Sequence, residues 1–140
     1  MASSAKGGYI PIMTDRMISK DPDAIAPDGS EVRILAQTQR GSMAQFTLPA
    51  GQISLAVAHK TVEEVWFFVS GQGQFWRRVD EMEAVTPIRP GLSISIAVGT
   101  EFQFRNDGTE PLVAIGTTMP PWPGMDEAYV VEGKWPPSLG

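Results

Sequence analysis

The residues of this chain best suited to chemistry gather between Gly51 and Gly71. His59 is the sole histidine, and Glu63 and Glu64 follow it after a short break. An imidazole and a carboxylate in an apolar cleft suffice for general acid–base work such as isomerisation, dehydration or cyclisation. The same two groups can instead form an internal hydrogen bond that satisfies two buried polar side chains. The sequence leaves catalysis and this structural role of His59 and Glu64 equally open.

A metal site would need more ligands than this stretch supplies. Divalent transition metals bound by imidazole and carboxylate take three or four protein ligands. The chain has no cysteine and no second histidine, so His59 and Glu64 would be metal ligands only if a metal is bound at all. We therefore expect no cofactor, or at most a weakly bound divalent metal.

The composition excludes several classes of protein. With 140 residues the chain is expected to be one domain that can bury a core. A formal charge of −5 means that the chain lacks the excess of basic residues with which proteins bind nucleic acid or anionic membranes. No apolar run approaches the roughly 20 residues of a membrane span, and the first residues lack the apolar centre of a secretory signal. We expect a cytoplasmic protein that binds neither nucleic acid nor membrane.

Short strands joined by tight turns must position the candidate residues. The chain has 12 prolines and 14 glycines, with β-branched and aromatic residues between them, which is typical of strands. No helical periodicity occurs before Met119. The pattern predicts an all-β sandwich or small barrel. The expected strands cover residues 31–36, 43–48, 53–59, 65–69, 74–79, 85–88, 92–98, 102–105 and 111–118.

Aromatic residues are the second signal in these strands. Alternation places Glu64, Trp66 and Phe68 on one face of their strand, and the opposite face is also apolar, so we expect burial on both sides. Core packing is the commoner role of such aromatics, but as a group they can also line a ligand pocket. The expected ligand-binding residues are Val57, Trp66, Phe68, Gln74, Trp76, Phe102, Phe104, Met119 and Trp122.

The two ends of the chain differ from its centre. Residues 1–29 predict an irregular arm with at most one short strand, and its apolar part, Tyr9–Ile12, could cover an edge strand of a partner. Residues 119–140 have too many prolines for regular structure. We expect this tail to pack on the outside of the barrel, with Trp122 and Trp135 as anchors.

The stretch around His59 resembles the first motif of the cupin superfamily. That motif runs glycine, five residues, His-x-His, three or four residues, glutamate, six residues, glycine. The corresponding residues at that spacing are Gly51, Val57, His59, Glu64 and Gly71.

A later stretch resembles the second cupin motif. That motif runs glycine, five residues, proline, one residue, glycine, two residues, histidine, three residues, asparagine. The paired motifs imply a cupin double-stranded β-helix, the RmlC-like jelly-roll barrel, over residues 30–118. The residues at the places of the second motif are Gly91, Ala97, Gly99, Phe102 and Asn106.

The departures from these motifs concern the metal. Typical metal-binding cupins use both histidines and the glutamate of the first motif with the histidine of the second, and here Val57 and Phe102 replace two histidines. The resemblance thus implies a small-molecule-binding cupin with a degenerate metal site. Phenylalanine in place of histidine suits an apolar or aromatic ligand. A metal-independent isomerase or lyase acting through Glu64 and His59 fits this pocket.

Two other functions stay open. One is a metal-dependent, oxygenase-like cupin with a reduced ligand set, and the other is a non-catalytic ligand sensor or a structural protein. Cupin barrels commonly pair through sheet edges and N-terminal arms, so the resemblance also implies a homodimer.

Overall fold

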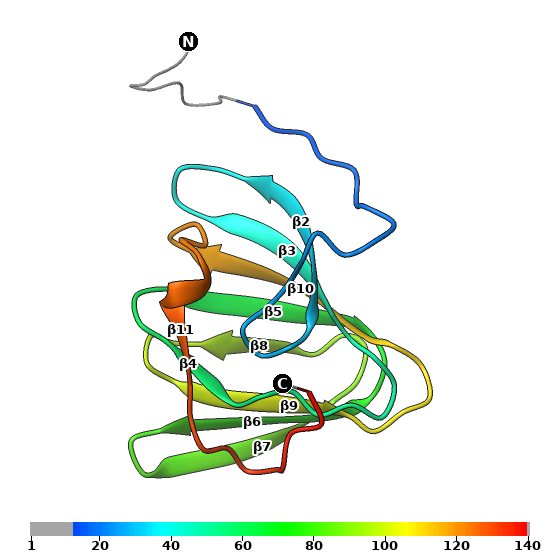
Figure 1. The fold of residues 1–140 in the computed structure, drawn as a ribbon, viewed down its shortest axis with the longest axis vertical. Helices are drawn as coiled ribbons and strands as arrows, with labels where there is room; N and C mark the ends of the chain where they lie inside the picture. The colour runs from blue at the N-terminus through cyan, green and yellow to red at the C-terminus, as the bar shows by residue number, and fades with distance from the viewer. Residues whose placement is uncertain (1–12, 140) are drawn as a thin grey trace.

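The computed structural model describes residues 13–139 and is built almost wholly of strands in two antiparallel sheets (Figure 1). This confirms the all-β jelly-roll prediction. In chain order the elements are β1 (Ala24–Ile25), β2 (Glu31–Gln37), β3 (Ser42–Leu48), β4 (Val57–His59), β5 (Glu63–Ser70), β6 (Gly73–Val79), β7 (Met82–Ile88), β8 (Ser93–Ile96), β9 (Glu101–Asn106), β10 (Leu112–Met119), the 3-10 turn η1 (Met125–Glu127) and β11 (Ala128–Val130).

The strand order interleaves distant parts of the chain. The six-stranded sheet runs β1-β2-β3-β10-β5-β8, and the five-stranded sheet runs β11-β4-β9-β6-β7. Consecutive strands therefore often lie in different sheets, as β4 and β5 do. This crossing brings the end of β4, with His59, close to the start of β5, with Glu64.

Glycine turns make the crossings possible. The motif residues Gly51, Gly71, Gly91 and Gly99 all have positive φ, a conformation that side-chain-bearing residues rarely adopt. At Gly71 a Cβ would also collide with the backbone of Pro111 and Leu112. The glycine spacing of the motifs thus reflects where the chain must turn between sheets.

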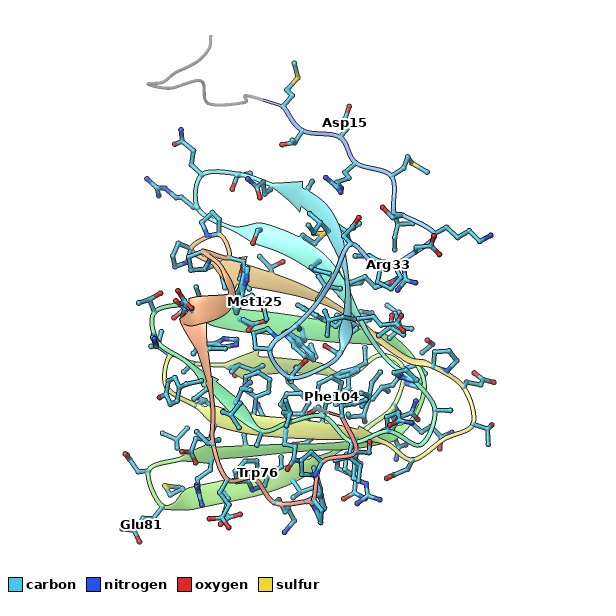
Figure 2. The ribbon with its side chains drawn as sticks, in the orientation of Figure 1. Asp15, Arg33, Trp76, Glu81, Phe104 and Met125 are labelled. Carbon is cyan, nitrogen blue, oxygen red and sulfur yellow. The ribbon has the colours of Figure 1, made fainter. Side chains whose placement is uncertain are left out.

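Side chains crowd the space between the sheets, where Phe104 lies (Figure 2). Phe75 stacks on Phe102 with ring centroids 5.7 Å apart and on Phe104 at the same separation. Trp66 meets Phe104 edge to face at 5.3 Å. Such aromatic pairs add packing energy to the burial of their surface. The core is therefore aromatic at its centre, as the alternation in β5 and β9 predicts.

The expected burial of β5 on both faces was wrong. Glu64, Trp66 and Phe68 face inward and are buried, but Val65, Phe67 and Val69 are 49%, 47% and 44% exposed. An antiparallel sheet needs only one covered face. Among residues 13–139, no segment covers the outer face of β5. This leaves a half-exposed apolar surface on the six-stranded sheet.

The expected inward direction of Gln74 and Trp76 was also wrong. In β6 the inward residue is Phe75, which pairs with the inward Phe104 of β9. Trp76 lies on the opposite face, where its indole N–H donates to Glu83 Oε1 at 2.8 Å. Gln74 donates to the exposed Asp107 carboxylate. Phe75 and Trp76 are both aromatic, so the sequence did not show which one faces inward.

The tail after β10 has more regular structure than its prolines predict. Residues Met125–Glu127 form a turn of 3-10 helix, and β11 then pairs with β4 through Ala128 and His59 (Figure 1). The expectation of no regular structure was therefore wrong for residues 125–130. β11 lacks proline, so its backbone N–H groups can join the sheet.

A buried glutamine attaches the last part of the tail to the five-stranded sheet. Gln103 donates to the carbonyls of Ser54 and Trp135 at 2.8 Å each. Its Oε1 accepts from the backbone N–H groups of Lys134 and Trp135 at 3.0 Å each. Three of the four hydrogen bonds of this buried amide thus hold the tail against the barrel, and the fourth joins it to Ser54.

The start of the barrel differs from the expected pattern in two places. β1 is the short strand expected in the arm, and it extends the six-stranded sheet beside β2. The strand expected over residues 53–59 forms only from Val57, because Ile53 makes a single bridge to Arg105. Tyr9–Ile12, expected to contact a partner, lies outside the described residues. No helix within residues 13–139 is long and apolar enough to cross a membrane.

Candidate functional site

A cavity of about 220 Å³ lies inside the barrel beside the facing ends of β4 and β5. Its walls come from strands β2, β3, β4, β5, β9 and β10. The arm contributes residues 24–28, and the tail contributes Trp122 and Met125. Figure 2 labels Met125, in the turn just before β11. The pocket is therefore assembled from nearly the whole length of the described chain.

The His59–Glu64 pair lies in the wall of this cavity. His59 Nδ1 is 2.8 Å from Glu64 Oε2, and both side chains are almost fully buried. The indole N–H of Trp66 donates to the other carboxylate oxygen, Oε1, at 2.7 Å. Trp66 follows Glu64 by two residues on the same strand face, so alternation alone brings donor and acceptor together.

The contact between His59 and Glu64 is close, but its angles are not those of a hydrogen bond. Among residues 13–139, His59 Nδ1 is the buried side-chain nitrogen or oxygen that has no hydrogen-bond partner. A buried polar atom left in this condition is costly in a fold that has no use for it. The Glu64 carboxylate is nevertheless within ion-pair distance of this nitrogen, so the two side chains form one buried pair.

Aromatic rings surround the pair. The imidazole of His59 meets Phe102 edge to face at 5.3 Å and Trp122 at 5.2 Å. On the facing wall Phe46 stacks on Trp66, with ring centroids 4.7 Å apart and planes 15° apart. The pocket therefore offers flat apolar surfaces to a ligand.

Asp28 is a pocket residue that the sequence analysis missed. It falls within the arm expected over residues 1–29, and it lies in a turn in which the Gly29 N–H donates to the Ala26 carbonyl. The turn folds over the pocket, however, and Asp28 is buried in its wall. Its Oδ1 accepts hydrogen bonds from the Ser30 N–H at 2.9 Å and the Ser30 hydroxyl at 2.7 Å.

Burial raises the pKa of Asp28 above its ordinary value of 3.8. The negative charge of Glu64 raises this pKa further, whereas the Ser30 hydrogen bonds and the charge of His59 lower it. No local sequence pattern marks Asp28 as buried, because the segments that bury it are distant in the chain. Its contact with the pocket depends on the whole fold.

The structure brings together some of the predicted site residues and separates others. Phe68 and Phe104 are buried in the core away from the cavity wall. Met119 pairs with the exposed Glu63 and so faces away from the interior, while its neighbour Thr118 faces the cavity. Gln74 and Trp76 are on the outer face of the other sheet, as described above. The predicted residues that do line the cavity are Val57, His59, Glu64, Trp66, Phe102 and Trp122.

The donor set does not fit a metal centre of the usual kind. Val57 and Phe102 are cross-strand partners in β4 and β9, so the two positions that lack histidine are adjacent. Within residues 13–139, no three His, Cys, Asp or Glu side chains are grouped closely enough to hold an ion. Asp28, His59 and Glu64 line one cavity without converging on one point.

Solved structures share this fold at low sequence identity. The capsular polysaccharide assembling protein CapF of Staphylococcus aureus matches 87% of this chain at 19% identity with a TM-score of 0.67. This chain spans only 33% of CapF. A protein of Klebsiella pneumoniae with a double-stranded β-helix domain is 15% identical and has a TM-score of 0.61. The match covers 85% of this chain and 91% of the Klebsiella protein.

Sequence comparison agrees with the fold. An uncharacterised protein of Methanocaldococcus jannaschii is 27% identical over 124 residues, which are 82% of this chain and 96% of that protein. The model of the cupin domain family matches residues 44–117. That match contains both motif stretches from Val57 to Asn106 and more than half of the chain. The protein therefore belongs to the cupin domain family.

Proposed function

We propose that this protein binds a small, largely apolar molecule in the cavity and transfers a proton on it through His59 and Glu64, as an isomerase or lyase does. The observation that carries the proposal is the 2.8 Å contact of His59 Nδ1 with Glu64 Oε2 in the wall of an aromatic cavity. The cavity of about 220 Å³ is smaller than the ~300–1,000 Å³ of pockets for drug-sized ligands. The ligand is therefore expected to be about the size of a single substituted ring.

The geometry supports acid–base chemistry in three ways. Trp66 Nε1–H fixes one oxygen of Glu64 and so orients the other toward His59. Burial of both groups keeps bulk water away, which strengthens their electrostatic effect on a ligand. The close contact of His59 Nδ1 with Glu64 Oε2 lets the two groups share a proton, so the pair can accept a proton from an acidic C–H and return it at another position.

Two alternatives predict different behaviour. A non-catalytic sensor would bind the same ligands without transferring a proton. A metal-dependent enzyme would need a bound ion, and the grouping of acidic and histidine side chains in residues 13–139 does not favour one. Both alternatives can be separated from the proposal by one pair of measurements.

The test uses phenylacetone, a one-ring ketone with acidic α C–H bonds. Binding is followed by the fluorescence of Trp66 and Trp122, and chemistry by proton NMR of solvent deuterium entering the α-carbon. We expect wild-type protein to bind the ketone and accelerate exchange in the presence of a chelator. Glu64→Gln should retain binding and lose exchange, because an amide keeps the shape of the carboxylate but accepts no proton.

Glu63→Gln is the matched control, since Glu63 precedes Glu64 on β5 but points outward. Its exchange rate should equal that of the wild type. Binding without exchange would favour the sensor, and exchange that disappears with the chelator would favour the metal-dependent enzyme. Absence of any binding would overturn the proposal.

A further inference from the structure

The charges around the cavity are unbalanced. Two carboxyl groups, Asp28 and Glu64, line it together with one imidazole, His59. No lysine or arginine is among the described residues that line it. A ligand carboxylate or phosphate would therefore meet like charges and find no lysine or arginine to pair with. The cavity is suited to a neutral or positively charged ligand.

The two carboxyl groups differ in how their charges are compensated. Glu64 has a partner on each oxygen, Trp66 on Oε1 and His59 near Oε2. Asp28 has both of its described hydrogen bonds on Oδ1, from Ser30. No hydrogen bond from the described residues reaches Asp28 Oδ2. This oxygen is not fully buried, since His59 Nδ1 is the one fully buried side-chain nitrogen or oxygen of residues 13–139 that lacks a partner. A buried carboxylate of this kind must either take up a proton or find a cation.

No basic residue of the described chain forms an ion pair with Asp28. The ion pairs in residues 13–139 involve other acids: Asp23, Glu31, Glu64, Glu101 and Asp107. Burial raises the pKa of Asp28, which agrees with a charge that lacks compensation in the free protein. A cationic ligand would supply that compensation.

The walls of the cavity also suit a cation. Phe46, Trp66, Phe102 and Trp122 all line it. The face of an aromatic ring attracts an ammonium group, most strongly for tryptophan and when the site excludes water. The stacked pair Phe46–Trp66 and the ring of Trp122 beside His59 contribute to this lining. The same rings can bury an apolar body attached to the ammonium group.

We propose that the cavity binds a small organic ammonium ion, with its charged nitrogen at Asp28 and its apolar body among Trp66, Phe102 and Trp122. This inference rests on the proposed small-molecule site and names the chemical class of its ligand. Asp28 is then the residue that determines specificity, and His59 and Glu64 remain the acid–base pair. An amine, not a carboxylate or a phosphate, is the group that the protein recognises.

The test compares three one-ring probes of nearly equal size: benzylamine as the ammonium ion, benzyl alcohol and benzoate. Binding to the wild-type protein is measured by tryptophan fluorescence and by calorimetry. We expect benzylamine to bind about tenfold more tightly than benzyl alcohol, from one charged contact with aromatic support. Benzoate should not bind measurably.

Two variants locate the preference. Asp28→Asn keeps an oxygen for the two Ser30 donors, and it should reduce benzylamine affinity about tenfold while leaving that of benzyl alcohol unchanged. Asp126→Asn removes the same charge from an exposed position in the tail and should change neither affinity. An equal loss of benzylamine affinity in both variants would mean that long-range charge, and not Asp28, sets the preference, and would overturn the inference.

The wild-type comparison decides the inference without any variant. Benzyl alcohol binding as tightly as benzylamine would overturn the ammonium assignment and leave the proposed small-molecule function standing. Measurable benzoate binding tighter than that of benzylamine would do the same. Failure of all three probes to bind would overturn both the assignment and the proposed function.

Discussion

The rings of His59 and Phe102 pack edge to face, with centroids 5.3 Å apart and planes 85° apart. Phe102 is the position where the cupin motif has a metal-ligating histidine, and the ring contact shows that this position does face His59. The replacement therefore changes the wall of the pocket next to the His59–Glu64 pair. It exchanges a possible metal ligand for an apolar surface.

A histidine at position 102 should begin to restore a metal site. Phe102→His would add a third donor beside His59 and Glu64, and three ligands can hold a divalent ion whose remaining positions bind water. We expect calorimetric titration to show cobalt or nickel binding that the parent lacks. The lost aromatic burial should lower stability by about 1–3 kcal/mol.

Phe104→His is the control, because Phe104 lies in the core away from the cavity wall. Equal metal binding by Phe102→His and the parent would contradict the site geometry.

Asp28→Asn should stabilise the protein at neutral pH. Burial raises the pKa of Asp28 in the folded state above 3.8, and the charge of Glu64 raises it further. Together they outweigh the Ser30 hydrogen bonds and the charge of His59, which lower this pKa. The folded protein thus holds this proton more tightly than the unfolded chain, so its stability falls as pH rises through the raised pKa. Asparagine stays neutral, and the melting-temperature gain should be largest near pH 7 and vanish below about pH 4. A variant less stable than the wild type at pH 7 would contradict this expectation.

Glu127→Gln should have the opposite effect. Burial raises the pKa of Glu127. Hydrogen bonds from the Thr61 hydroxyl and from the Thr61 and Val62 N–H groups lower it, and together with the charge of His59 they outweigh the effect of burial. The folded pKa therefore lies below the ordinary 4.5, and the carboxylate stabilises the fold above that pH. The variant should lose on the order of 1–2 kcal/mol at neutral pH. Denaturant titrations should show this loss shrinking as pH falls through the folded pKa. A loss that is constant with pH would show that the ionised form has no special role.

Gly133→Ala should loosen the tail from the barrel. A Cβ at Gly133 would collide with the buried Gln103 amide and with the Ala56 side chain. We expect a loss of about 1–3 kcal/mol in thermal or denaturant unfolding, as for other overpacked sites. Gly108→Ala is the control, since a Cβ there meets its neighbours at ordinary contact distances of 3.5 Å or more. Equal stability of the two variants would show that the amide cluster at Gln103 can rearrange freely.

The homodimer remains a prediction. The half-exposed Val65, Phe67 and Val69 on β5 add a physical reason for it, because monomeric proteins rarely leave large apolar patches uncovered. Light scattering should give twice the chain mass at micromolar concentration. Phe67→Asp should shift the mass toward that of one chain, whereas Glu63→Gln should not. A single-chain mass for the wild type would contradict the prediction.

The alternation of inward and outward side chains along each strand determined much of the fold, and this alternation is visible in the sequence. Glu64, Trp66 and Phe68 had to share a face because side chains in a strand point alternately to opposite sides. Ile94 and Ile96 are buried, and Ser93 and Ser95 are exposed, for the same reason. The motif glycines marked the turns because few other residues tolerate positive φ. These features depend on residues close together in the chain.

Only the tertiary structure decided which residues meet at the pocket. The choice between Phe75 and Trp76 as the inward aromatic required the register of β6 against β9. The pairing of β11 with β4, and the hydrogen bonds of Glu127 to Thr61, join segments more than 60 residues apart. Asp28 became a pocket residue because the arm folds over strands that come later in the chain. Burial by distant segments leaves no periodic pattern in the sequence of the residues that are buried. The His59–Glu64 pair was therefore predictable, and Asp28, the second acidic group of the cavity, was not.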